Sequence, residues 1–176
     1  MKSVRADRGY VLIILMMVVL ALIIGLTVAV PVLQTELRRE KEAELIFRGR
    51  QYIEAIRLYQ MKTPGRFPSS LKELEEKRLI RKLYRDPMTD SGEWNVVLPL
   101  EELGQAGSEG AQKVLVAPES VLPSIRNPLV LGVVSSSTQK SFKLYYGQDS
   151  YDKWLFIYGQ DPKNPPQIVI YGQEEE

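Results

Sequence analysis

The sequence predicts an α+β protein, in which a long N-terminal transmembrane α-helix continues into a small domain with an antiparallel β-sheet. Three observations support this fold class. Residues 10–33 form an uncharged apolar run, apolar side chains then recur with helical spacing as far as Tyr59, and from Trp94 onward the apolar period becomes that of strands. Once the run and its charged continuation are set aside, the 176-residue chain has room for one modest domain.

The composition excludes several classes of function. The chain has 23 basic and 22 acidic residues, so its net charge is close to zero and gives no overall attraction to nucleic acid. Cysteine and histidine are both missing from the sequence, which excludes disulfides, thiol nucleophiles and thiolate or imidazole metal ligands. The sequence also has no glycine-rich phosphate loop, and carboxylate pairs such as Asp149 and Asp152 are adjacent only in sequence. We therefore expect no catalytic residues and no cofactor.

The apolar run is long enough to cross a membrane. Its 24 residues reach about 36 Å as a helix, against a hydrocarbon core of roughly 30 Å. The apolar core of a cleavable secretory signal is shorter, and a domain this small could not enclose a helix that is apolar all round. Lys2, Arg5 and Arg8 precede the run and favour a cytoplasmic N-terminus. We predict a single span with the C-terminal domain on the other side.

Pro31 and Gly25 interrupt the regularity of this run. The proline lacks an amide donor, which frees the carbonyl of Thr27, and the glycine adds backbone freedom about one and a half turns earlier. One interpretation is a tolerated kink near the membrane interface. The other is a stretch that changes conformation when helices pack together. The residues alone leave both open.

Residues 34–44 are mostly helix formers of alternating charge, which predicts a solvated continuation of the same helix. One helix should therefore extend from about residue 10 to residue 60. Its last turns should pack on the domain through one apolar face, which comprises Leu45, Ile46, Gly49, Tyr52, Ile53, Ile56 and Tyr59.

Local signals then divide the domain into a short helix and several strands. The long helix should end at the Thr63-Pro64-Gly65 turn, and Ser70 with Glu73 predicts a capping box at the start of a second helix. Turn residues then separate six expected strands, at 94–98, 113–117, 129–134, 141–146, 153–158 and 166–171. Apolar residues on both faces of 153–158 predict a central strand.

The N-terminal half resembles the type IV pilin superfamily, and most closely the pseudopilins of type II secretion systems. The resemblance begins with the basic leader ending in Arg8-Gly9, followed by aromatic Tyr10 at the start of the apolar helix, and with Pro31 at the twenty-second residue counted from Tyr10. It continues with "IEAIRLYQMKTPGRFPSSLKEL" and the Asp-Pro loop "YRDPMTDSGEW". These features cover residues 1 to about 95.

The resemblance implies processing and assembly. A prepilin peptidase would cut between Gly9 and Tyr10 and usually methylate the new amine, and Pro31 would mark where the helix locally unwinds. Subunits would then leave the inner membrane for a filament, with other pilin-like subunits and an inner-membrane assembly platform as partners. The expected parts are a leader (1–9), a transmembrane helix (10–33), its periplasmic continuation (34–61), a globular domain (62–172) and an acidic tail (173–176).

Two departures from the family pattern affect the expected role. The fifth mature residue is usually glutamate, but Ile14 occupies that position here, which favours a minor subunit. The family's terminal calcium loop has only weak candidates, Asp149, Asp152 and Asp161, which serve equally well in strand-connecting turns. The alternative is a single-pass, membrane-anchored periplasmic binding domain that forms no filament.

Overall fold

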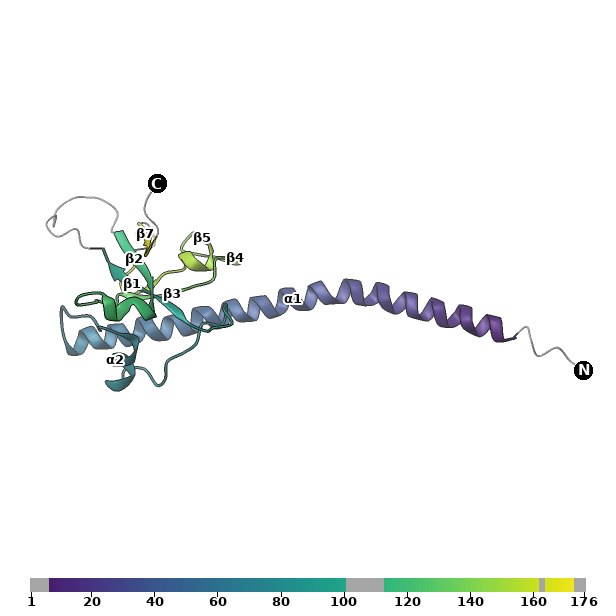
Figure 1. Ribbon diagram of the computed structural model, residues 1–176, viewed down its shortest axis with the longest axis horizontal. Helices are drawn as coiled ribbons and strands as arrows, with labels where there is room; N and C mark the ends of the chain where they lie inside the picture. Colours follow the sequence, from purple (N-terminus) through teal and green to yellow (C-terminus); the bar gives the residue numbers. More distant parts are fainter. Residues whose placement is uncertain (1–6, 101–112, 162–163, 173–176) are drawn as a thin grey trace, which may run out of the picture. The chain divides into compact units, whose positions relative to one another are not determined.

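The computed structural model describes residues 7–100, 113–161 and 164–172, and it divides the chain into two compact units, residues 1–40 and 41–176 (Figure 1). The fold is α+β, as predicted. In chain order the elements are α1 (Asp7–Lys62), α2 (Leu71–Glu76), β1 (Trp94–Pro99), β2 (Lys113–Pro118), the 3-10 helix η1 (Glu119–Ser124), β3 (Gly132–Ser135), β4 (Lys140–Tyr145), β5 (Gln148–Ser150), the 3-10 helix η2 (Tyr151–Lys153), β6 (Phe156–Ile157) and β7 (Gln167–Ile170).

The long helix is confirmed as a single element, α1, which continues through Pro31. Within it, Tyr10–Thr27 has a mean hydropathy of 2.9, and none of this segment is buried within the chain. It is the one helix among the described residues that is long and apolar enough to cross a membrane. The segment thus differs from a buried core helix of similar composition.

The sheet of the second unit is mixed, which corrects the expectation of an antiparallel sheet. Five strands lie in the order β6-β3-β1-β2-β7, and β4 pairs with β5 in a separate hairpin. The pairs β1–β2, β1–β3 and β3–β6 are antiparallel, but β7 runs parallel to β2. The chain crosses from β6 at one edge of the sheet to β7 at the other, so β7 is not joined to β2 by a short turn, the connection that would require antiparallel pairing.

Two of the strand predictions need correction. The strand expected at 129–134 begins only at Gly132, and that expected at 153–158 shrinks to the two residues of β6. This strand also lies at the sheet edge instead of its centre. Its side chains nevertheless alternate between two buried clusters, because Phe156 packs in one and Leu155 in the other. Strand β5 has no counterpart among the expected strands.

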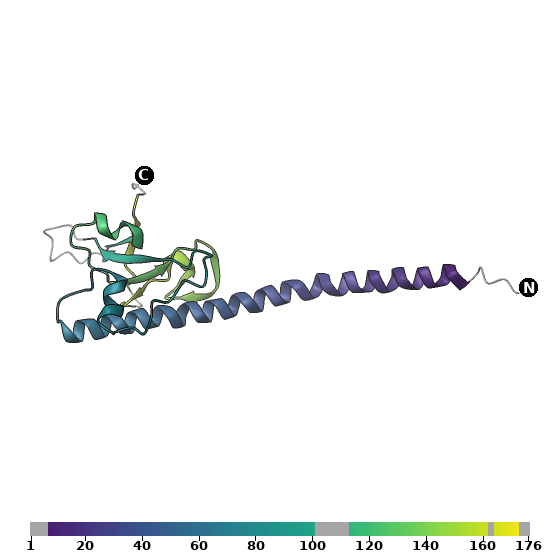
Figure 2. The same ribbon diagram turned by 60° about the horizontal axis from the view of Figure 1, so that its bottom comes forward.

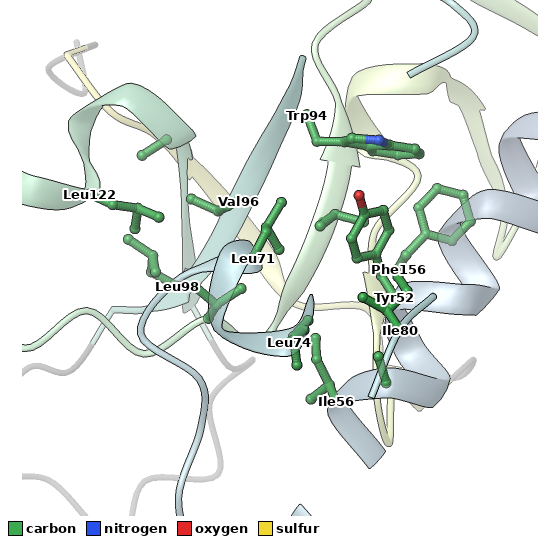
Figure 3. Close-up of a cluster of buried hydrophobic side chains, with 14 of the residues drawn as sticks. Tyr52, Ile56, Leu71, Leu74, Ile80, Trp94, Val96, Leu98, Leu122 and Phe156 are labelled. Atoms are coloured by element: carbon green, nitrogen blue, oxygen red, sulfur yellow. The ribbon is translucent and has the colours of Figure 1, made fainter. Parts of the chain in front are cut away.

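The main core lies between the helices and one face of the sheet (Figures 2 and 3). The predicted helical face is confirmed, since Leu45, Tyr52 and Ile56 are at most 1% exposed. Tyr52 stacks edge-on against Trp94, with ring centroids 5.7 Å apart. The Tyr52 hydroxyl and the Trp94 indole both donate to the carbonyl oxygen of Tyr84, at 2.9 and 2.8 Å, which fixes the connection between α2 and β1 against α1.

The cap of α2 also joins it to α1. As predicted, the Ser70 hydroxyl accepts a hydrogen bond from the Glu73 amide, at 3.3 Å. The Glu73 carboxylate does not bond back to Ser70; it accepts from the amide of Ser69, the hydroxyl of Tyr59 and the ammonium of Lys77. Burial acts to raise the pKa of Glu73, but these hydrogen bonds outweigh it and lower the pKa to about 2.

Candidate functional site

The expected processing junction lies at the very start of α1. Since the helix begins at Asp7, Arg8, Gly9 and Tyr10 belong to its first turn or border it. The first N–H groups of a helix have no intrahelical acceptor, so this turn opens at lower cost than an interior turn with a full set of helical hydrogen bonds. Tyr10 is 67% exposed. The peptide bond between Gly9 and Tyr10 is therefore in a segment that an enzyme can unwind.

Tyr10 and Ile14 lie one turn apart on the same side of α1. Ile14 is 41% exposed, so its side chain is available to a neighbouring helix or to lipid. Isoleucine offers only apolar contact there. Sequence analysis located this position because it is the fifth residue counted from Tyr10, the first residue after the expected junction.

Gly25 and Pro31 lie further along the same helix. A side chain added at Gly25 would meet no atom within 4 Å, so packing inside the chain does not require glycine there. The Thr27 hydroxyl donates to the carbonyl oxygen of Ile23 at 2.8 Å. The carbonyl of Thr27 itself lacks the usual helical donor, because that donor would be the nitrogen of Pro31. The interior of α1 thus lacks one backbone hydrogen bond around 27–31 although the helix is continuous, and both interpretations of Pro31 are compatible with this.

The three weak calcium candidates are dispersed over separate elements. Asp149 is exposed in β5, Asp152 belongs to η2, and Asp161 is exposed beyond β6. Within residues 7–100, 113–161 and 164–172, no group of three or more Asp, Glu, His or Cys side chains is arranged to hold a metal ion. Calcium needs several converging oxygen ligands, so this assignment gains no support from the geometry.

Sequence analysis missed a buried carboxylate at Glu42. The residue belongs to the segment predicted to be solvated, and that prediction is wrong for it, since Glu42 is 0% exposed. Its Oε1 accepts from the hydroxyl of Tyr151 at 2.7 Å and from the amide of Phe142 at 2.6 Å. Its Oε2 is buried and has no hydrogen-bond partner in the part of the chain that the structure describes. Helical spacing could have revealed this burial, because Glu42 precedes Leu45 by three residues and so lies on the same inward-packing face of the helix.

Replacing Glu42 with alanine should lower the free energy of unfolding by about 3 kcal/mol, because two donors, on Phe142 and Tyr151, would lose their acceptor. Glu42→Gln keeps one acceptor oxygen and should cost less. The measurement is denaturant unfolding of the full chain in detergent. The control is Glu44→Ala, which removes a partly exposed ion pair with Arg48 and should cost under about 1 kcal/mol. Equal losses for both alanine variants would contradict the assigned role of Glu42.

A second buried carboxylate, Asp86, holds the Asp-Pro loop against β3. Its oxygens accept from the hydroxyl of Ser135 at 2.6 Å and from the amide of Met88 at 2.8 Å. Burial raises the pKa of Asp86, although these hydrogen bonds oppose the rise. These hydrogen bonds order the loop that contains Asp86.

Comparison with known proteins leaves the function to be argued from the chain itself. No protein-family model matches the sequence, and neither a curated protein nor a solved structure matches it. Three features of the chain bear on its function: the start of α1, the unburied apolar segment of this helix, and the packing of its second half into the domain.

Proposed function

We propose that this chain is a pilin-like subunit, of the pseudopilin type, in a type II secretion or type IV pilus-like filament of the cell envelope. One observation carries the proposal: the Arg8-Gly9-Tyr10 junction falls in the first turn of a helix whose early segment, Tyr10–Thr27, is apolar and unburied. We further propose that its role is that of a minor subunit, because Ile14 replaces the glutamate expected by resemblance.

The burial pattern of α1 supports this proposal. An apolar helix segment with no partner inside its own chain must be covered by lipid or by other helices. Lipid would cover it before assembly, as a single inner-membrane span with a cytoplasmic N-terminus and a periplasmic domain, which the basic residues Lys2, Arg5 and Arg8 favour. Helices of neighbouring subunits would cover it afterwards.

The alternative, an anchored binding domain without assembly, requires the same span but gives no reason for the junction. In our proposal Gly9 and Tyr10 are the processing site, and Gly25 with Pro31 provides the stretch that unwinds as helices pack. The partners are other pilin-like subunits, a prepilin peptidase and an inner-membrane assembly platform. Processing is therefore the property that separates the two functions.

Coexpression with a prepilin peptidase should shorten the chain by residues 1–9, leaving Tyr10 as the first residue with a methylated amine. The measurement is the intact mass of the membrane-extracted protein. Gly9→Leu should block the cut, since a bulky side chain replaces the small residue before the cleaved bond, while membrane extraction is unchanged.

Gly25→Leu is the matched control for that variant, because it makes the same change beyond the junction, where nothing lies within 4 Å. It should be processed normally. If the wild-type chain kept residues 1–9 beside an active peptidase that cuts a known prepilin, the filament proposal would fail and the anchored-domain alternative would stand.

A further inference from the structure

The hairpin of β4 and β5 stands apart from the five-stranded sheet, as Figure 1 shows. Its tip is Tyr146-Gly147, with φ of 49° and 79°, the pair of positive values that a tight two-residue turn requires. The side chain of Tyr145 points inward and stacks near Trp154, with ring centroids 5.4 Å apart. The side chains of Phe142, Leu144 and Tyr146 are exposed instead.

The exposed part of the hairpin is largely apolar. Phe142 is 53% exposed, Leu144 71% and Tyr146 39%, and Lys140 at the start of β4 is also exposed. We call these four residues the hairpin face. Exposed aromatic and leucine side chains beside a lysine are typical of segments that meet the polar boundary of a bilayer.

The charge of the hairpin is positive. Lys140 and Lys143 are both exposed, and within residues 140–150 the one acidic side chain is Asp149. Each lysine near an anionic lipid surface contributes about 1 kcal/mol of attraction. The hairpin thus complements anionic headgroups in charge as well as in apolar character.

The hairpin is also tied to the part of α1 nearest the apolar run. The amide of Phe142 donates to Glu42, and Glu42 follows Leu33, the end of the apolar run, by only nine positions along the chain. Nine positions span at most about 32 Å of chain. The covalent connection alone therefore keeps the hairpin close to the membrane that the run would cross.

We propose that the hairpin face, Lys140, Phe142, Leu144 and Tyr146, docks on the anionic lipid headgroups of the membrane that α1 crosses. The inference rests on the anchoring part of the proposed function and is independent of filament assembly. A second copy is a poorer occupant, because the three apolar side chains expose roughly 300 Å², well below what a stable dimer interface buries. A lipid surface needs no matching shape.

The test uses the full chain, which contains no native cysteine and so allows single-site labelling. Leu144→Cys would carry an environment-sensitive fluorophore in nanodiscs of phosphatidylethanolamine and phosphatidylglycerol, with a fraction of nitroxide-headgroup lipid as quencher. We expect a blue-shifted emission that the nitroxide quenches. Replacing phosphatidylglycerol with phosphatidylcholine should abolish most of the quenching. Lys140→Glu and Lys143→Glu should each lower the ratio of docked to undocked protein at least about fivefold.

Two further labels make each result decisive. Met61→Cys is the matched control, since Met61 is 66% exposed and apolar but lies at the far end of α1, and its label should not be quenched. Val18→Cys tests anchoring, and acyl-chain nitroxides should quench its label.

A quenched Val18 label with unquenched Leu144 would overturn the docking inference and leave anchoring intact. A blue-shifted Leu144 label that no nitroxide quenches would overturn it in favour of a protein partner. An unquenched Val18 label would overturn anchoring and docking together.

Discussion

Replacing Gly49 with alanine is expected to lower the free energy of unfolding by about 2 to 3 kcal/mol, by overpacking the core. Helix propensity alone gives the opposite sign, because alanine stabilises a helix interior by about 1 kcal/mol relative to glycine. Sterics decides the outcome here. A Cβ at Gly49 would overlap the ring of Phe156, which is 0% exposed and held between α1 and the sheet. The ring has no free space into which it could move.

The same helix provides a matched control. Gly25→Ala makes an identical change where nothing lies within 4 Å, so it should leave stability unchanged or raise it slightly. Both variants would be compared with the parent chain by denaturant unfolding in detergent, followed by near-UV circular dichroism. In a Phe156→Leu background the Gly49→Ala change should cost less, since the ring that causes the overlap is gone. Similar effects of the two alanines would refute a close approach of α1 to β6.

The case of Gly49 illustrates what the sequence could predict. The spacing of apolar residues placed Gly49 on the packed face of the helix, and the cap at Ser70 was found because both signals are local. Nothing local showed that Phe156, more than 100 residues away, would fill the space that the glycine leaves. Contacts of that kind depend on tertiary arrangement.

The same distinction explains the corrections to the sheet. A strand's existence follows from its own alternation, so β1, β2 and β7 were predicted within one or two residues. The parallel pairing of β7 and the separate β4–β5 hairpin depend on where the chain crosses, which periodicity does not encode.

The candidate site was predictable to a similar extent. Gly9, Tyr10 and Ile14 are found by counting along one segment, and the apolar run is a property of composition. Glu42 was wrongly predicted to be solvated, because alternating charges are typical of an exposed helix. The hydrogen bonds that it accepts from Phe142 and Tyr151, which lie about 100 residues further along the chain, are what bury it.

Under the proposed function, the isoleucine at position 14 should strongly affect self-assembly, because it helps decide whether the chain forms filaments by itself. By resemblance, a carboxylate at this position pairs with the N-terminal amine of a neighbour, which offsets a cost of roughly 3 kcal/mol for a charge within the bilayer. Ile14 avoids that cost and forfeits the pairing. The amine of Tyr10, one turn away on the same side of α1, is still offered to another subunit. A head-to-tail filament of one kind of subunit needs both the amine and the carboxylate on every subunit, and this chain would supply only the amine.

We therefore expect the processed chain to form few filaments alone and to co-assemble with glutamate-containing pilin-like subunits. The experiment is expression with a prepilin peptidase, with and without such partners, followed by shearing and electron microscopy. Ile14→Glu should increase self-association. Ile13→Glu is its matched control, because it adds the same charge one residue earlier, about 100° around the helix, where no pairing is expected. Long filaments from the lone parent chain would refute the minor role and show that helix packing in lipid suffices without the carboxylate.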